Sequence, residues 1–241
     1  MSINATTAVR DLAIEVPGAT RLFEKLGIDY CCGGARPLTE ACSTAGIKVD
    51  DVVRSLEQAT AASSEKKEDR DWRVEPLTAL VSYILDMHHA FDREELARLD
   101  PLLTKVASVY RESHPELVEI HRVFIELKQD LLNHMMKEEQ VLFPYIIQLQ
   151  EAADRGGAKP FPFFGTVRNP VSMMMLEHDT VGDMLRQIRE LSSNFEVPSE
   201  GCVSYRTLYE ALEGLERDLH THIHLENNLL FPRAVTMEAG D

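Results

Sequence analysis

Two stretches of this chain, His134-Met-Met-Lys-Glu138-Glu-Gln-Val-Leu-Phe-Pro144 and His222-Ile-His-Leu-Glu226-Asn-Asn-Leu-Leu-Phe-Pro232, share the pattern H-x3-E-x3-L-F-P. On a helix, the i,i+4 spacing places the imidazole and the carboxylate about 40° apart on one face and one turn apart in height. Both side chains can therefore reach one point in space, as metal ligands do. A lone His-x3-Glu is most often a surface ion pair, but two copies with the same tail favour a pair of metal ligands.

Four helical segments are predicted after residue 75, at about 77–99 or beyond, 115–147, 171–191 and 205–230. In each segment apolar residues recur at intervals of three or four. Where the next apolar residue is expected, each segment carries polar side chains instead: His88-His89, His134 with Glu138, His178, and His222 with Glu226. Buried polar groups are costly without partners, so these side chains are expected to share one polar centre.

The spacing of the histidines indicates an internal repeat. His89 and His134 are 45 residues apart, and His178 and His222 are 44 residues apart. The pattern predicts an all-α fold with an up-down-up-down four-helix bundle, made of two helix pairs that each contribute one lone His and one His-x3-Glu. The dipeptide Asp100-Pro101 is expected to kink or end the first helix.

The donor set of four imidazoles and two carboxylates restricts the choice of metal. Structural zinc sites are usually closed by four ligands that include cysteines, and calcium and magnesium prefer oxygen ligands. Two redox-capable first-row ions, each with two histidines and both bridged by the two glutamates, use every ligand and leave coordination positions open. Iron is the preferred metal, ahead of manganese. Ferritin-like bundles use Glu-x-x-His, so this pattern indicates a different class.

The two H-x3-E-x3-L-F-P stretches, Glu177-His178-Asp179 and the helix with His88-His89 together resemble the hemerythrin-like domain of the RIC (Repair of Iron Centres) family. The stretch Asp29-Tyr30-Cys31-Cys32-Gly33-Gly34 is similar to the short CC-containing domain that precedes it in that family. The resemblance covers essentially the whole chain. Its combination of motifs is much more specific than any one His-x3-Glu.

The resemblance implies a di-iron protein, with two iron ions bridged by oxygen and two glutamates, that repairs iron–sulfur clusters damaged by nitric oxide or peroxide. Carried over to this chain, the iron ligands are His89, His134, Glu138, His178, His222 and Glu226. His88 is the alternative to His89 as the first ligand. Apolar residues before the doublet favour a face through His88, and those after it favour a face through His89. The position relative to Arg93-Glu94-Glu95-Leu96 resembles the family at His89, which is therefore preferred.

Several functions are compatible with such a centre. The preferred one is cluster repair, by supplying or redox-cycling iron, with damaged iron–sulfur proteins as partners. An enzyme that reduces nitric oxide or peroxide and a sensor that binds O2 or nitric oxide are the alternatives. A sensor is disfavoured because no DNA-binding or signalling output domain is recognisable. The structural alternative is a bundle with buried His–Glu pairs and no metal.

Residues 1–60 are expected to form a small helical domain, with short helices at about 7–15, 19–26, 38–45 and 52–59. A linker at 61–74 and the bundle at 75–237 follow. Cys31 and Cys32 lie beside two glycines in a turn, which makes them candidate redox thiols for electron transfer, disulfide exchange or transient metal handling. Two reduced thiols with a packing role are the alternative.

Four further side chains lie near the ligand candidates in sequence. His220 and His224 are about 200° round the helix from His222 and are expected to be solvated, with a contact to a metal ligand as the alternative for one of them. Their i,i+4 spacing also occurs in zinc sites. Glu139 and Glu177 adjoin ligand candidates. They are expected either to hydrogen-bond to ligands or to lie on a solvated face.

The charge balance bears on partners and location. The chain has 25 basic and 40 acidic residues, a formal net charge of −15, so nucleic acid and anionic membranes are not expected partners. No stretch approaches the ~18 apolar residues of a membrane span, and a signal peptide is not recognisable. These features and the four scattered cysteines predict a cytoplasmic protein. Both a monomer and a homodimer are compatible with the sequence.

Overall fold

The computed structural model describes residues 3–62 and 70–240, in which helices are joined by loops and one isolated β-bridge pairs Ala8 with Pro37. The predicted all-α fold is confirmed. Two compact units are present, one of residues 1–76 with 220–233 and one of residues 77–219 with 234–241. Of the predicted linker at 61–74, residues 63–69 lie outside the described residues.

The N-terminal domain consists of α1 (Val9–Glu15), α2 (Ala19–Leu26), α3 (Leu38–Thr44) and α4 (Val49–Ala62). One apolar core joins them and includes Leu12, Phe23, Leu38 and Leu56. The first three helices begin and end within two residues of their predicted bounds, whereas α4 begins three residues before its predicted start. Local sequence signals were therefore sufficient for most of this domain.

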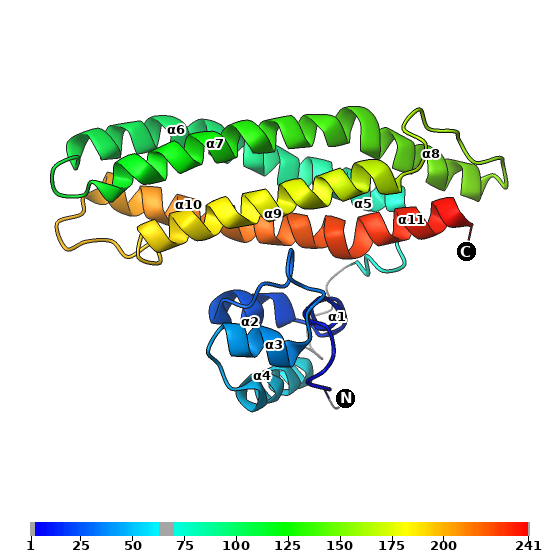
Figure 1. The fold of residues 1–241 in the computed structure, drawn as a ribbon, viewed down its shortest axis with the longest axis horizontal. Helices are drawn as coiled ribbons and strands as arrows, with labels where there is room; N and C mark the ends of the chain where they lie inside the picture. Colours follow the sequence, from blue (N-terminus) through cyan, green and yellow to red (C-terminus); the bar gives the residue numbers. More distant parts are fainter. Residues whose placement is uncertain (1–2, 63–69, 241) are drawn as a thin grey trace. The chain divides into compact units, whose positions relative to one another are not determined.

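The rest of the chain forms long helices that correspond to the four predicted segments (Figure 1). Three of these helices contain a short π-helical stretch, labelled η, in their middle. In chain order the elements are α5 (Leu77–Tyr83), η2 (Ile84–His89) and α6 (Ala90–Val109); α7 (Glu116–Lys137), η3 (Glu138–Leu142) and α8 (Phe143–Asp154); α9 (Arg168–Leu191); and α10 (Val203–Leu225), η4 (Glu226–Leu230) and α11 (Phe231–Ala239).

Contacts between neighbouring helices close the bundle. Helix α7 packs against both α6 and α9. Arg189 on α9 donates through Nε to Glu216 on α10, at 2.9 Å. Asp218 on α10 lies 2.9 Å from Nδ1 of His88 at the end of η2. Successive long helices run in opposite directions (Figure 1), which is the predicted up-down-up-down arrangement.

Helix α6 continues through Pro101 to Val109, so of the two expectations for Asp100-Pro101, a kink or an end of the helix, the end is wrong. Leu99, Leu103 and Val106 are all buried, on both sides of the proline. Proline removes one backbone hydrogen bond, but burial of the same apolar stripe continues beyond it. Packing against the bundle therefore outweighs the local disruption.

The π-helical segments η3 and η4 begin at Glu138 and Glu226, the two glutamates of the repeated pattern. In both, the N–H of the phenylalanine in the Leu-Phe-Pro tail donates to the carbonyl of that glutamate, five residues earlier. The next residues, Pro144 and Pro232, have no N–H, and a proline ring crowds the carbonyl four residues before it. The wider turn accommodates this crowding, so the shared tail accounts for the same distortion in both helices.

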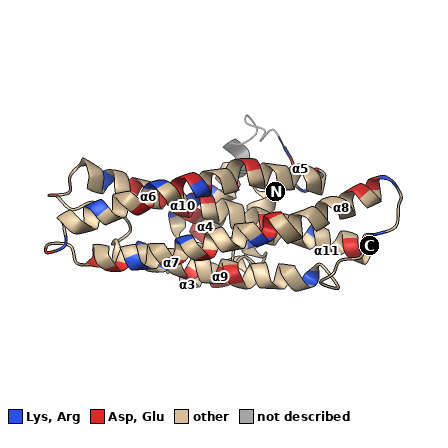
Figure 2. Ribbon diagram, turned by 90° about the horizontal axis from the view of Figure 1, so that it is seen from above, with Lys and Arg blue, Asp and Glu red and all other residues tan. Residues whose placement is uncertain are grey.

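Acidic and basic side chains are interspersed along the bundle helices (Figure 2). Several form pairs one turn apart, such as Glu95 with Arg98 and Glu119 with Arg122. Exposed pairs of this kind each contribute little to stability. The apolar core must therefore supply most of the free energy that holds the helices together.

Candidate metal centre

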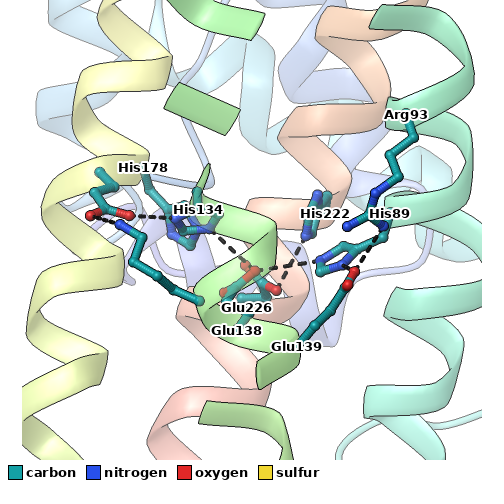
Figure 3. Close-up of polar contacts among 10 residues, drawn as sticks. His89, Arg93, His134, Glu138, Glu139, His178, His222 and Glu226 are labelled. Atoms are coloured by element: carbon teal, nitrogen blue, oxygen red, sulfur yellow. Dashed lines mark hydrogen bonds and ion pairs between the residues drawn. The ribbon is translucent and has the colours of Figure 1, made fainter. Parts of the chain in front are cut away.

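The six predicted ligand residues converge inside the bundle and are almost completely buried (Figure 3). They form two groups of four, and within each group the donor atoms all lie within 4.8 Å of one another. One group is His89, Glu138, His222 and Glu226, and the other is His134, Glu138, His178 and Glu226. Both glutamates belong to both groups, so the arrangement provides two adjacent positions for cations that share their carboxylates.

The imidazoles direct Nε2 towards the centre. Nε2 of His89 lies 3.4 Å from Oε2 of Glu138, and Nε2 of His134 lies 3.3 Å from the same oxygen. The Nε2 atoms of His134 and His178 are 3.0 Å apart. Two nitrogens bound to one ion at about 2.1 Å and at right angles are also separated by about 3.0 Å. The donor spacing thus fits a first-row ion.

The second repeat contributes its pair in the same way. Nε2 of His222 lies 3.2 Å from Oε1 of Glu226, and both side chains are at most 1% exposed. Glu138 and Glu226 are each 0% exposed and close together, and burying two neighbouring carboxylates is costly unless cations neutralise them. Two divalent ions would supply that charge, and the mixed nitrogen and oxygen donors suit iron or manganese. The residues therefore fit a dinuclear centre.

The π-helical segment η2 explains the two competing faces at His88-His89. It lies directly before α6 and shifts the helical phase, so that the apolar faces before and after it do not align. Both histidines are consequently buried, with exposures of 4% and 0%. His89 faces the metal positions, whereas Nδ1 of His88 contacts Asp218. His89, the preferred residue of the two, is thus the one that belongs to a donor group, and its role as a ligand stays a prediction.

Two glutamates bind the outer nitrogens of the ligand imidazoles. Oε1 of Glu139 lies 2.8 Å from Nδ1 of His89 and 2.8 Å from Nη1 of Arg93. Oε2 of Glu177 lies 2.8 Å from Nδ1 of His134, and its other oxygen accepts from Lys137. Of the two expectations for these glutamates, hydrogen bonding to ligands agrees with the structure. Their positions next to ligand candidates in the sequence identified these two glutamates. Their contacts with Arg93 and Lys137 were not anticipated.

These carboxylates are ionised at neutral pH. The hydrogen bond with His134, followed by that with Lys137, lowers the pKa of Glu177 to about 2. Burial raises the pKa of Glu139, but Arg93 and His89 outweigh this effect and bring it below its usual value. An ionised carboxylate accepts the Nδ1–H of an imidazole, which leaves the Nε2 lone pair for the metal position.

Glu177→Gln is expected to weaken iron binding about 10–100-fold at the position that His134 and His178 share. Glutamine keeps the shape of the side chain but loses the negative charge that holds the imidazole in its metal-binding tautomer. Competition with a chelator measures the affinity. Glu126→Gln, which removes an exposed carboxylate paired with Arg122 on α7, is the control and should leave it unchanged. Equal affinities in both variants would contradict this role.

His224 differs from expectation. It is 5% exposed, and Nδ1 accepts from Nδ2 of Asn228 at 2.8 Å, so the expected solvation is wrong for this residue. Burial lowers its pKa to about 4, which keeps the imidazole neutral at neutral pH. His220 is partly buried. As the angle of about 200° predicts, neither histidine belongs to a donor group. The prediction of solvation assumed that only the His222 face of α10 is buried, whereas His224 is buried as well.

Cys31 and Cys32 are both reduced and lie next to Asp29 in the N-terminal domain. Their sulfur atoms are 3.8 Å apart, with Cys31 buried and Cys32 partly exposed. The hydrogen bond between the two thiols, together with burial, raises the pKa of Cys31 well above its ordinary value. Asp29 is a neighbour that sequence reasoning did not single out, although it lies only two residues before Cys31.

None of the described helices is long and apolar enough to cross a membrane.

Two family models match parts of the chain. Residues 5–60 match a family model described as a domain of unknown function, and residues 80–234 match the hemerythrin HHE cation-binding domain. The chain is 34% identical to the iron-sulfur cluster repair protein YtfE of Citrobacter koseri and 35% identical to those of Escherichia coli O81 and Escherichia fergusonii. Each of these alignments covers 95% of this chain and 96% of the relative.

Proposed function

Because this chain belongs to the family of iron–sulfur cluster repair proteins with a hemerythrin-type cation-binding domain, we propose that it repairs iron–sulfur clusters damaged by nitrosative or oxidative stress. The proposal includes two iron ions in the bundle, held by His89, His134, Glu138, His178, His222 and Glu226. The observation that carries it is the pair of buried four-residue groups that share both glutamates.

Each part of the centre has a distinct task. The four imidazoles direct Nε2 towards the metal positions, where they would hold two ions together with the carboxylates of Glu138 and Glu226, whose charge would neutralise that of the ions. Iron bound there would supply redox chemistry. Glu139 and Glu177 accept the outer N–H groups of His89 and His134 and thereby fix which nitrogen faces inward. Burial of all six ligands excludes bulk water from the positions.

The chemistry of the ligands bears on whether iron can be passed on. The centre has imidazole and carboxylate donors and no thiolate, and thiolates are the softer ligands that iron–sulfur cluster sites present. Iron held by nitrogen and oxygen donors can therefore move to a cysteine-lined acceptor site without competing against thiolates at its source. We propose this direction of transfer, from the bundle to a damaged cluster protein.

Mixing the iron-loaded protein with an iron–sulfur protein whose cluster has been destroyed by nitric oxide tests the proposal. With sulfide, a thiol reductant and a ferrous chelator present, the client is expected to regain its cluster absorption and activity, because the chelator traps only free iron. The same amount of ferrous iron without the protein should give no recovery. Recovery no better than with free iron would overturn the iron-supply proposal. Steady consumption of nitric oxide or peroxide would favour a reductase instead.

A further inference from the structure

A second group of metal-binding side chains lies in the N-terminal domain, in the turn between α2 and α3. The donor atoms of Asp29, Cys31 and Cys32 lie within 4.8 Å of one another. We propose that these three residues form a separate site for one thiophilic divalent ion of the Fe2+ or Zn2+ class. All three come from the turn itself, so the proposal does not depend on the centre in the bundle.

The distances match those expected around one ion. The two sulfur atoms are 3.8 Å apart, and Oδ1 of Asp29 is 3.5 Å from the sulfur of Cys31. Two thiolates bound at about 2.3 Å to a tetrahedral ion lie about 3.8 Å apart, and a thiolate and a carboxylate oxygen lie slightly closer. An ion can therefore bind without a large rearrangement of the turn. Its binding would release the two thiol protons to solvent.

The backbone of the turn holds this arrangement in place. Oδ1 of Asp29 accepts the backbone N–H groups of Cys31 and Cys32, at 3.2 and 3.0 Å. The N–H of Arg10, on α1, donates to the carbonyl of Gly34 at 2.8 Å. A Cβ atom at Gly34 would lie 2.5 Å from the carbonyl oxygen of Tyr30, so only glycine fits there. A rigid turn lowers the cost of assembling the donors on an ion.

The charge and exposure of the group favour an exchangeable ion. Two thiolates and one carboxylate leave a divalent ion with a net charge of about −1, and the Arg36 guanidinium borders the same glycine, Gly33, as the Asp29 carboxylate. Cys32 is partly exposed, so an ion can enter from solvent. Three protein ligands also leave one tetrahedral position open, as in zinc sites that bind a further ligand rather than in closed structural sites.

Titration of the reduced full-length protein with Co2+ tests the site. Thiolate ligands give Co2+ a near-ultraviolet charge-transfer absorption that imidazole and carboxylate ligands do not give, so Co2+ bound in the bundle does not add to this band. We expect the band to saturate when one equivalent per chain has bound in addition to the ions that the bundle takes up. It should be lost in Cys31→Ser and in Cys32→Ser. Cys202→Ser, which removes an exposed thiol elsewhere, is the control and should keep the band.

Asp29→Asn separates metal binding from a purely structural role. The asparagine oxygen can still accept the two backbone N–H groups, but the negative charge is gone. The affinity for Co2+ is expected to fall at least about tenfold, while the melting temperature of the metal-free protein stays within a few degrees. The proposal is overturned if the wild type shows no thiolate band, if the band survives either serine substitution, or if Asp29→Asn binds as tightly as the wild type.

The thiolate absorption band of Co2+ tests this site independently of the function proposed above. Iron in the bundle is counted by its own stoichiometry and does not contribute to the thiolate band. Cluster repair without a thiolate band would overturn the site and leave the function standing. A thiolate band without cluster repair would do the reverse.

Discussion

Glu138→Gln is expected to abolish tight iron binding at both positions of the centre, because this carboxylate belongs to both groups of donors. Removing one charge from a buried ionic cluster costs about 3–5 kcal/mol. At 1.4 kcal/mol per tenfold, the affinity of each position should fall by about two to three and a half orders of magnitude. Iron per chain after gel filtration, together with competition against a chelator, measures this loss.

In the absence of metal, Glu138→Gln is expected to make the protein more stable. In the iron-free protein, Glu138 and Glu226 are two buried carboxylates within one small group, and glutamine removes the repulsion between them. The free energy of unfolding of the iron-free variant is therefore expected to rise by roughly 1 kcal/mol or more. Urea denaturation of both iron-free proteins measures the difference.

Two outcomes would contradict this account of Glu138. Retention of two iron ions by the variant would remove the carboxylate from the ligand set. A loss of iron that accompanies a less stable iron-free protein would indicate a packing role instead. Glu126→Gln on the same helix, α7, controls for the general effect of the change, because its carboxylate is exposed and pairs only locally with Arg122.

His222→Ala is the second substitution with a large expected effect, and His224→Ala is its matched control. Both imidazoles are buried on α10, two residues apart, but only His222 belongs to a donor group. His222→Ala should lose more than half of its iron. The substitution weakens the position that contains His222, and the other position is also affected because the two positions share both glutamates. His224→Ala should retain two ions. Metal analysis and the Mössbauer spectrum of each purified variant check this.

The pair distinguishes metal binding from packing. Each substitution leaves a cavity of the same size in the same helix, so both iron-free variants should lose a similar amount of stability, about 2–4 kcal/mol. Equal iron loss in the two variants would mean that the loss follows the cavity and not the ligand. Retention of full iron in His222→Ala would show that the ion is held without that imidazole.

The local pattern of the sequence was sufficient for the helices and for the residues that meet inside the bundle. At His134, His178 and His222 a polar residue replaces an apolar one at helical spacing, and a buried polar group needs a partner. Helical spacing considers only the residues of one helix at a time. It could not decide the buried face where the helix is irregular. The π-helical segment η2 shifts the phase at His88-His89, and a rule based on 3.6 residues per turn cannot represent such a shift.

Contacts between side chains on different helices also could not be predicted from the spacing within one helix. Glu177 was noticed only because it adjoins His178, yet its contact is with His134 on α7. His224 was assigned to solvent because its face of α10 lacks the apolar repeat, yet it is buried. For Glu177 the decisive atom belongs to a helix that is distant in sequence.

The sequence by itself determined that polar side chains on four apolar helix faces meet inside the bundle, because a buried polar group needs a partner. Only the tertiary structure decided how they are divided. It groups His89 with His222 and His134 with His178, around glutamates common to both. The physical reason is that helical periodicity specifies the direction of a side chain from its own axis. Which imidazoles share an ion depends on how separate axes are placed around the core.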